Sequence, residues 1–378
     1  MNVAIIGETA GSGGLLALMR GVLNCDEIPS NINVYFFCSK NLHELLPDIS
    51  NRINVIETGL FYDRSLKEKL TYSLQRDFIA LVKSYNPDIV FYINGSLKKG
   101  LEEYRSIFLF NNQLYVDMKK LIALGLSKTT LTLLREAYYA RKALRNADLV
   151  IFSSHFSKDG VEKSGIRIKD SAVISLSCSN VFRREGRCAY FAPGKEVIDL
   201  LYISSILPYK NQLPVLHATR RLHDDGFNVK LTLIGKNIAK NYAKKFYAYI
   251  DKFGMRDYIE HIEWVKYDDI PAIIDKCDIF INASSTDTCG TSVCEGMARG
   301  TVIAANNTSF NKDMLADAGE YFDINDEDTI YAALLKLIEN PELRDEYANK
   351  GYELSRKYTL DDTAKAYYSL FIKDKSGI

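Results

Sequence analysis

The sequence lacks net charge, zinc-type cysteine pairs and long apolar runs, and each absence excludes a class of protein. Lys plus Arg and Asp plus Glu number 48 each, so the molecule as a whole has no electric field that would attract nucleic acid. The seven cysteines include no Cys-x-x-Cys pair and no zinc-type histidine spacing, a pattern typical of free thiols in a reducing cytoplasm. No apolar run approaches the roughly 18 residues of a membrane span.

The beginning of the sequence does not have the pattern of a secretion signal. Residues 1–18 have no cationic start, and Glu8 and four glycines interrupt their apolar residues. We therefore expect a cytoplasmic protein. Apolar residues make up 47% and charged residues 25%, which are ordinary values for a globular chain, and 378 residues are enough for two or three domains.

Short apolar runs alternate with longer amphipathic stretches, and the alternation occurs in two series. The first series covers residues 2–153 and the second covers residues 200–305. Such repeats of a strand and a helix predict an α/β protein with two doubly wound parallel sheets. Residues 180–194, which show no sustained period and end in Pro193-Gly194, are the predicted linker. Ligands of such sheets bind at the carboxyl ends of the strands, so we expect functional residues in strand-to-helix loops.

The first loop of interest is glycine-rich and follows the first predicted strand. Residues 7–14 include Gly13 and Gly14 directly before a predicted helix, where backbone amides and the helix dipole can approach an anion. The loop is not a dinucleotide fingerprint, because Leu16 stands where a third glycine is needed, and no Gly-Lys-Ser/Thr follows to make a P-loop. A tight turn that serves only connection and packing is the alternative.

A second loop, residues 204–211, leaves the first strand of the second series. Lys210 precedes a predicted helix and can offer a point charge to a phosphate. A lysine in a surface loop is also commonly just solvated. This feature alone therefore does not decide between a phosphate-binding lysine and a solvated one.

The third loop, residues 284–300, carries the most information. Gly290 precedes Thr291 and Ser292 at a loop-to-helix junction, which suits a diphosphate because the first amides of a helix have no partner within it. Glu295 follows one turn later in an otherwise small and apolar stretch, which a solvated helix face would not explain. Asp287 lies in the loop itself, where an ordinary helix cap is the alternative.

The segment Asp287-x7-Glu295, followed by Gly296 to Ala304, resembles the E-x7-E region of the retaining glycosyltransferases of the GT-B fold, family GT4 or glycosyl transferases group 1, of the bacterial surface-polysaccharide type. Other segments resemble the family in the same order along nearly the whole chain. They are residues 107–115, 147–157, 201–211, 231–235, 263–271 and 358–371.

The resemblance implies an α/β fold of the GT-B type, with two Rossmann-like doubly wound domains that face each other across a cleft. Residues 1–185 would form the acceptor domain and residues 195–358 the nucleotide-sugar donor domain. Residues 359–378 would form a carboxyl-terminal helix that crosses back and packs on the first domain.

The implied activity is retaining transfer of a sugar from a nucleotide-diphosphate sugar to a saccharide or lipid-linked saccharide. Lipopolysaccharide, capsule or exopolysaccharide synthesis in bacteria is the implied setting, with no metal and no cofactor. A catalytically silent scaffold that binds a nucleotide sugar or a partner enzyme is the alternative. An epimerase or a phosphorylase on the same scaffold would need extra cleft acids and a histidine, or a cofactor lysine, and the sequence offers no convincing set of either.

The resemblance also assigns roles to particular residues. Catalytic roles fall to Asp287, which would address the transferred sugar, to Glu295, which would hold the ribose hydroxyls, and to Lys210 on the phosphates. The implied donor-binding set is Gly13, Gly14, Ser205, Lys210, Gly290, Thr291, Ser292 and Glu295, and the cleft-facing residues are Asn111 and Asn112. An Asp326-Glu327-Asp328 segment is predicted to cap a helix rather than to bind a metal.

Three positions depart from the family pattern. Asp287 stands where glutamate is usual, so the acid is one methylene shorter toward the sugar. Ser205 stands where many members carry a phosphate-binding arginine, which leaves Lys210 as the cation of that loop. Ser177-Cys178-Ser179 replaces the usual Asn-Gly-x-Asp turn before the linker. The first two departures favour the silent scaffold among the alternatives.

A cationic, leucine-rich stretch covers residues 118–145. Its lysines and arginines outnumber its single acid, Glu136, so the stretch can rest on anionic headgroups. We therefore expect a peripheral position on the inner face of the plasma membrane. A helix that faces the core and has a solvated basic side is the alternative. The basic residues are Lys119, Lys120, Lys128, Arg135, Arg141, Lys142 and Arg145.

Overall fold

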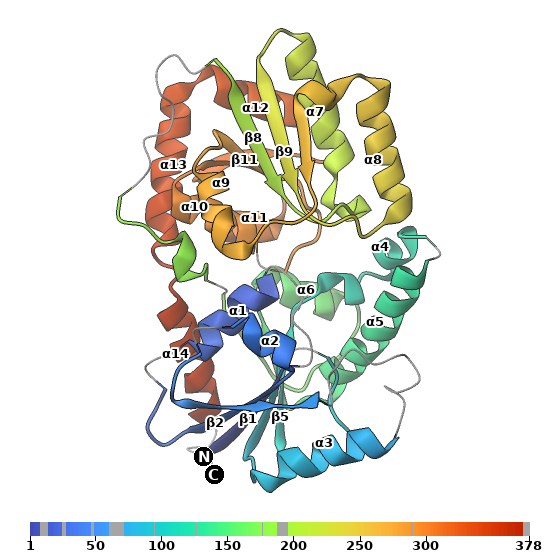
Figure 1. The fold of residues 1–378 in the computed structure, drawn as a ribbon, viewed down its shortest axis with the longest axis vertical. Helices are drawn as coiled ribbons and strands as arrows, with labels where there is room; N and C mark the ends of the chain where they lie inside the picture. The colour runs from blue at the N-terminus through green and yellow to red at the C-terminus, as the bar shows by residue number, and fades with distance from the viewer. Residues whose placement is uncertain are drawn as a thin grey trace. The chain divides into compact units, whose positions relative to one another are not determined.

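The computed structural model divides the chain into two compact units. The first unit consists of Met1–Leu121, Leu131–Ser177 and Thr359–Ile378, and the second of Ile122–Thr130 and Cys178–Tyr358. The structure describes residues 1–7, 14–24, 28–46, 49–59, 72–93, 95–125, 127–175, 177–186, 196–288 and 290–372. Figure 1 shows the ribbon with its elements labelled.

The sheet of the first unit is parallel in every pairing and has seven strands in the order β3-β2-β1-β4-β5-β6-β7. The order runs outward in both directions from β1 and β4, which is the doubly wound arrangement. The strands are β1 (Asn2–Gly7), β2 (Asn33–Cys38), β3 (Ile53–Glu57), β4 (Ile89–Tyr92), β5 (Arg105–Phe110), β6 (Leu149–Phe152) and β7 (Ser171–Val173).

Helices cover both faces of this sheet, as β4 illustrates. Val90 and Tyr92 belong to an apolar cluster that also contains residues of α3 and α5, whereas Phe91 between them packs on Tyr367 and Phe371 of α14. Successive strand residues point to opposite faces, so α14 lies on the face opposite α3 and α5. The helices are α1 (Gly14–Leu23), α2 (Lys40–Glu44), α3 (Tyr72–Ser84), α4 (Met118–Ala123), α5 (Lys128–Asn146), α6 (His155–Lys163) and α14 (Leu360–Ile372).

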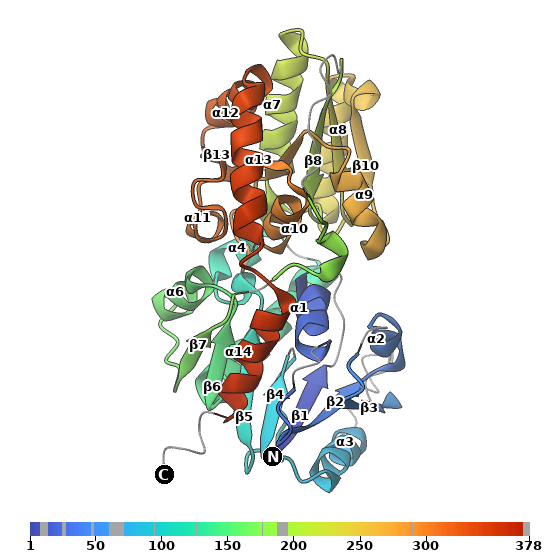
Figure 2. The ribbon, with the colours of Figure 1, turned by 90° about the vertical axis from the view of Figure 1, so that its left-hand side faces the viewer.

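The last helix, α14, therefore belongs to the first unit although the second unit precedes it in the chain. Tyr368 Oη donates to the carbonyl of Val22 in α1 at 3.0 Å. A Cβ added to Gly21 would lie 3.1 Å from Leu360, so α1 and α14 approach closely. Figure 2 shows the two helices side by side.

The sheet of the second unit is also parallel in every pairing, with six strands in the order β10-β9-β8-β11-β12-β13. The order reverses between β8 and β11, the place where ligands of doubly wound sheets bind. The strands are β8 (Ile198–Ile203), β9 (Val229–Ile234), β10 (Ile259–Ile262), β11 (Ile279–Asn282), β12 (Val302–Asn306) and β13 (Gly319–Phe322).

Two apolar clusters sandwich this second sheet. Ile279 and Ile281 face a cluster that includes α7, α8 and α12, whereas Phe280 faces a cluster that includes α9 and α10. The helices are α7 (Gln212–Asp224), α8 (Lys240–Lys252), α9 (Ile270–Ile274), α10 (Thr291–Arg299), α11 (Ser309–Leu315), α12 (Glu327–Glu339) and α13 (Pro341–Ser355). Short 3₁₀ turns are η3 (Gln113–Tyr115), η4 (Asn180–Phe182), η5 (Pro208–Lys210), η6 (Met255–Asp257) and η7 (Tyr267–Asp269).

Both units are thus Rossmann-like, and the prediction of two doubly wound α/β domains is confirmed. The predicted linker falls partly outside the described residues, which stop at Gly186 and resume at Glu196. Its first part is ordered as the turn η4, which packs against α10 in the second unit.

Candidate functional site

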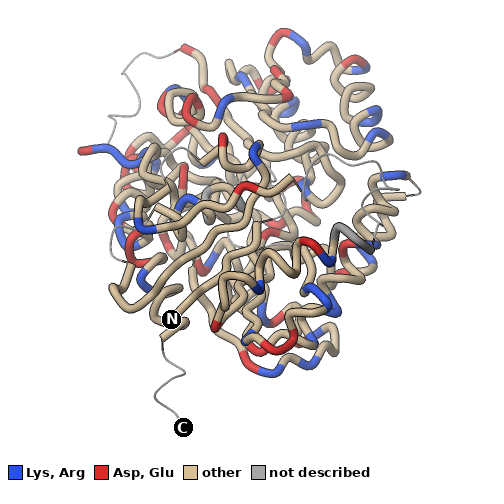
Figure 3. The backbone as a smooth tube through the Cα atoms, turned by 60° about the horizontal axis from the view of Figure 1, so that its bottom comes forward, with Lys and Arg blue, Asp and Glu red and all other residues tan. Residues whose placement is uncertain are grey.

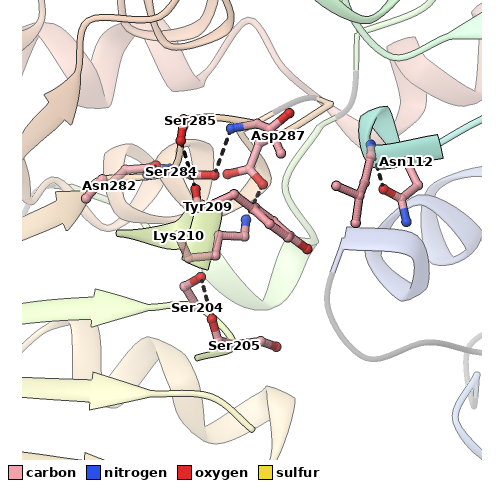
Figure 4. A network of polar contacts seen from close by, with 12 residues as sticks. Asn112, Ser204, Ser205, Tyr209, Lys210, Asn282, Ser284, Ser285 and Asp287 are labelled. Carbon is pink, nitrogen blue, oxygen red and sulfur yellow. Dashed lines mark hydrogen bonds and ion pairs between the residues drawn. The ribbon is translucent and has the colours of Figure 1, made fainter. Parts of the chain in front are cut away.

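Two strand-to-helix loops lie against each other at the carboxyl end of the second sheet, because β8 and β11 are neighbouring strands. Ser285 of the β11–α10 loop donates from its backbone amide to the carbonyl of Tyr209 at 2.9 Å. Asn211 donates from Nδ2 to the carbonyl of Ala283 at 2.7 Å and to Ser285 Oγ at 2.9 Å. Figure 4 shows these loops, which form one polar layer above the strands.

Lys210 and Asp287 form an ion pair across this layer (Figure 4). Both side chains are largely buried, with exposed fractions of 17% for lysine and 23% for aspartate. The backbone of Lys210 is held as well, since Tyr202 Oη donates to its carbonyl at 2.6 Å. The structure therefore brings two predicted site residues together, and each neutralises the charge of the other.

The Ser204–Ser205 backbone is fixed beneath Lys210. Gln212 at the start of α7 donates from Nε2 to the carbonyl of Ser205 at 2.8 Å. Gly235 crosses the same backbone from the β9–α8 loop: its φ is +155°, and an added Cβ would lie 2.2 Å from the carbonyl oxygen of Ser204. Only glycine fits such an approach. Gly235 is therefore a residue of the site region that the sequence analysis did not identify.

The loop before α10 is shaped by its own side chains. Asn282 Oδ1 accepts from the amide of Ser284 at 3.1 Å, and Ser284 Oγ accepts from the amide of Thr286 at 3.3 Å. Asn306 at the end of β12 donates to the carbonyl of Ser284 at 3.1 Å. These bonds turn the chain away from β11 toward Asp287.

Helix α10 begins at Thr291 after Gly290, whose left-handed φ of 58° makes the turn into the helix. The amides of Val293 and Cys294 both donate to the carbonyl of Gly290, at 2.9 and 3.1 Å. Thr291 and Ser292 therefore occupy the first turn, where helix geometry aims amides out of the end. This matches the arrangement that the sequence predicted for the three residues.

Glu295 lies on the same helix and is 94% shielded from solvent, with a relative exposure of 6%. Helix α10 lies close to the sheet because residue 296 is glycine: a Cβ there would approach Ile303 Cδ1 to 2.7 Å. Tyr267 Oη donates to Glu295 Oε1 at 3.0 Å. Burial raises the pKa of Glu295 to about 8, negative charge on Cys178 adds to the rise, and the bond from Tyr267 opposes it.

Two buried thiols lie beside Glu295. Cys178 and Cys294 are both free and fully shielded from solvent. The hydrogen bond between them lowers the pKa of Cys178 and raises that of Cys294, and burial raises the pKa of Cys294 further. The Ser177-Cys178-Ser179 departure from the family turn therefore places a polarisable thiol in the surroundings of the predicted ribose-binding acid.

The long segment of the second unit begins at Cys178 and ends at Tyr358. Arg183 connects these two places, because its guanidinium donates to the carbonyl of Ser355 at 2.9 Å and to the carbonyl of Tyr358. Next to it, Tyr352 Oη donates to the carbonyl of Arg184 at 3.0 Å. The incoming and the returning segments are thus tied together within the second unit.

The remaining predicted site residues belong to the first unit. Gly13 lies outside the described residues, and Gly14 is the first residue of α1. Asn111 and Asn112 follow β5 and are used locally: Asn112 Oδ1 caps η3 by accepting from the amide of Leu114 at 3.1 Å. Asn111 Nδ2 reaches the carbonyl of Ile93 at 3.5 Å.

Asp326 acts as the predicted helix cap. Its Oδ1 accepts from the amide of Asp328 at 3.1 Å at the beginning of α12. Asp328 itself pairs with Arg221 of α7. Over the described residues, histidine, cysteine and acidic side chains form no group of three or more that would suit a metal ion.

Solved structures with the same architecture define the class as the GT-B fold. Sucrose-phosphate synthase of Thermosynechococcus elongatus is 12% identical, with a TM-score of 0.75 over 100% of both chains. HepE of Anabaena, in complex with UDP-glucose, is 15% identical with a TM-score of 0.74 over 98% of this chain and 99% of that one. WaaG, a glycosyltransferase involved in lipopolysaccharide biosynthesis, is 13% identical with a TM-score of 0.71 over 98% and 99%.

The sequence assigns the second unit to a family. Residues 191–354 match the model of the glycosyl transferases group 1, the family that the sequence resembles. An uncharacterized glycosyltransferase of Methanocaldococcus jannaschii, MJ1178, is 23% identical over 231 residues. That alignment covers 59% of this chain and 59% of the relative.

Proposed function

We propose that this protein is a retaining glycosyltransferase that uses a nucleotide-diphosphate sugar as donor. The observation that carries the proposal is the ion pair between Lys210 and Asp287, which joins the loops after β8 and β11, with Glu295 on the helix α10 that follows the second loop. All of them lie in the part of the chain that matches the glycosyl transferases group 1. The known complexes of HepE with UDP and with UDP-glucose support a nucleotide sugar as the ligand to test first.

The diphosphate would lie at the beginning of α10. Amides of Gly290, Thr291 and Ser292 would bind its oxygens together with the helix dipole, and Lys210 would supply the positive charge. Departure of the diphosphate leaves negative charge on it, which these preoriented groups stabilise without a metal ion. Because Asp287 pairs with Lys210, donor binding would exchange one anionic partner of the lysine for another or add a second.

Glu295 and Asp287 would divide the rest of the donor between them. A carboxylate accepts two hydrogen bonds from adjacent ribose hydroxyls, and Glu295 lies one turn into α10, behind the predicted phosphate site. Asp287, nearer the loop end, would contact the transferred sugar, with Ser205 below Lys210. Gly13, Gly14, Asn111 and Asn112 of the first unit would serve the donor phosphates and the acceptor.

A saccharide on a lipid carrier is the proposed acceptor, because α5 presents a one-sided basic and apolar face. Leu131, Arg135, Tyr138, Lys142 and Arg145 are all exposed and follow one another at helical spacing, with Leu131 62% and Tyr138 65% exposed. Such a face suits the surface of an anionic membrane. Figure 3 shows charges of both signs elsewhere along the chain. No described helix has the length and hydropathy to cross a bilayer.

Bacterial surface-polysaccharide assembly is the proposed setting, by likeness to WaaG. A catalytically silent scaffold is the second candidate, and the Lys210–Asp287 pair favours it, because the pair neutralises the cation that is assigned to the phosphates.

One experiment separates the two candidates. The purified protein is incubated with UDP-, GDP-, ADP- and dTDP-sugars in the presence of a chelator, and release of nucleoside diphosphate is followed with and without saccharide acceptors. Slow hydrolysis or transfer from one donor that Glu295→Ala abolishes supports the enzyme. Donor binding without turnover supports the silent scaffold, and a requirement for divalent metal contradicts the metal-independent mechanism.

A further inference from the structure

Tyr267 reaches the predicted ribose-binding acid from a different part of the chain. It opens the turn η7 after β10, whereas Glu295 is on α10, and the two residues are 28 positions apart. The hydroxyl of Tyr267 donates to Oε1 of Glu295 at 3.0 Å. A buried carboxyl needs such a partner, because an unsatisfied polar group away from water is costly.

The ring of Tyr267 is itself held in place. Phe182 of η4 packs edge-on against it, with ring centroids 5.3 Å apart and an angle of 73° between the planes. The ring also packs on the apolar cluster that contains Cys178, Ile274 and Met297. A tyrosine with a fixed ring has a fixed hydroxyl position, so the bond to Glu295 has a defined direction.

The groups around Glu295 come from three elements. Tyr267 approaches from η7, Cys294 is its neighbour on α10, and Cys178 lies on the segment that enters the second unit. The positive charge of Arg183, on the same segment, lowers the pKa of Cys178. Burial and the charge of Cys178 raise the pKa of Glu295, and among these neighbours Tyr267 is the one that lowers it.

We propose that Tyr267 is a positioning residue for nucleotide recognition: it holds one carboxyl oxygen of Glu295 and turns the other toward the ribose hydroxyls of the donor. The inference rests on the proposed function of Glu295. It assigns to Tyr267 no contact with the reacting atoms. Its effect is on how well the carboxyl is oriented and on how readily the carboxyl accepts hydrogen bonds from the ligand.

Two consequences follow for Tyr267→Phe. Without the hydroxyl, the carboxyl of Glu295 loses a directed partner, and ribose recognition should weaken by about 10-fold, the usual effect of losing a hydrogen bond to a charged group. The pKa of Glu295 should also rise further, since the lowering contribution is gone. The pH at which nucleotide binding reaches half its maximum should therefore move upward.

The test measures Kd by calorimetry for UDP and for its 2′,3′-dideoxy analogue between pH 6 and 9, with wild type, Tyr267→Phe and Glu295→Gln. The ratio of the two Kd values isolates the ribose hydroxyls, because both ligands carry the same phosphates. If UDP does not bind, the test uses GDP or ADP instead, whichever binds. Tyr331→Phe is the matched control, since its hydroxyl donates to the carboxylate of Asp225 at 2.6 Å elsewhere in the second unit.

The wild type should prefer the ribose form, and this preference should fall about 10-fold in Tyr267→Phe and remain unchanged in Tyr331→Phe. Nucleotide binding by Glu295→Gln should show no pH midpoint, because residue 295 no longer titrates. A Tyr267→Phe protein that keeps the full preference and midpoint, while Glu295→Gln loses them, would overturn the inference and leave the proposed function intact. Absence of ribose preference in the wild type would overturn the proposed function, and the inference with it. Thermal unfolding of Tyr267→Phe shows whether a loss of binding reflects loss of the fold.

Discussion

Lys210 and Asp287 are 77 positions apart in the chain and form a largely buried ion pair at the edge of the second sheet. Neither charge is therefore simply available to a donor. The pair links the loop after β8 to the loop after β11. We therefore expect the two residues to act as one unit in donor binding rather than as separate contacts.

Lys210→Ala should lower kcat/KM. The expected loss of transition-state stabilisation is about 2–4 kcal/mol, by analogy with removal of one oxyanion donor. Part of the loss arises because Asp287 would be left unneutralised near the diphosphate. The double variant Lys210→Ala/Asp287→Asn should therefore lose less than the sum of the single effects. Steady-state kinetics of the three variants measure this coupling.

Lys336→Ala is the matched control for that cycle, because Lys336 pairs with Glu320 at 2.7 Å on another part of the same unit. It should leave kcat/KM within about two-fold of wild type. Strictly additive effects at Lys210 and Asp287 would contradict a functional unit.

Glu295→Gln should remove a pH dependence of stability. The pKa of Glu295 is raised from 4.5 to about 8 in the folded protein, so its contribution to stability is complete below pH 4.5 and is lost as pH rises to about 8. Over that window the free energy of unfolding of the wild type should fall relative to Glu295→Gln, by at most about 1.4 kcal/mol per pH unit. Urea unfolding at intervals across this range gives the two slopes, and equal slopes would show that Glu295 is ionised at neutral pH.

Gly235→Ala should destabilise the second unit and weaken donor binding. The new Cβ would overlap the carbonyl of Ser204 beneath Lys210, so the loop must move. We expect a loss of about 3 kcal/mol or more in the free energy of unfolding, since a backbone clash adds to the cost of the φ angle. Urea unfolding and nucleotide titration measure the two effects.

Gly226→Ala separates the clash from the backbone angle. Gly226 also has a positive φ, +93°, but an added Cβ would meet nothing within 4 Å. It should cost about 1 kcal/mol and leave nucleotide binding unchanged. Equal losses at the two positions would contradict a specific role for the approach of Gly235 to Ser204.

Charge reversal on α5 should abolish association with anionic vesicles. Arg135, Lys142 and Arg145 are exposed on one helix face, and replacing all three by Glu should prevent sedimentation with phosphatidylglycerol vesicles at low salt. The same number of reversals at Lys240, Lys244 and Lys245 on α8, which are also exposed, should have little effect.

Zwitterionic vesicles provide the second control, because they lack the negative surface potential. Equal loss of sedimentation in both triple variants would indicate that net charge, rather than α5, governs the association. Failure of the wild type to sediment with anionic vesicles would remove the membrane contact from the proposed function.

The fold was largely predictable because its signals are local. Buried parallel strands such as β11 (Ile-Phe-Ile-Asn) are continuous apolar runs, and Gly290 before Thr291 marks a helix start. The edge strands β7 and β13 were not predicted: they are short, and their mixed residues Ser171–Val173 and Gly319–Phe322 have neither an apolar run nor a clear alternation.

The candidate site was predicted in its residue types but not in its pairings. Nothing in the pattern around Lys210 indicates Asp287 as its partner, since β8 and β11 become neighbours only when the sheet forms. Tyr267 was equally hidden, because an aromatic residue before Asp268 and Asp269 suggests a turn or a core contact. The role that we propose for it depends on the direction of a single hydroxyl, which the sequence does not encode locally.

Arg183 joins the beginning and the end of the 178–358 segment of the second unit. Its guanidinium donates to the carbonyls of Ser355 and Tyr358, so the segment that begins at Cys178 is held against the segment that ends at Tyr358. Phe182, the residue before Arg183, packs its ring edge-on against Tyr267. The segment that closes the second unit therefore also supports the tyrosine whose hydroxyl bonds to the proposed nucleotide-binding acid Glu295.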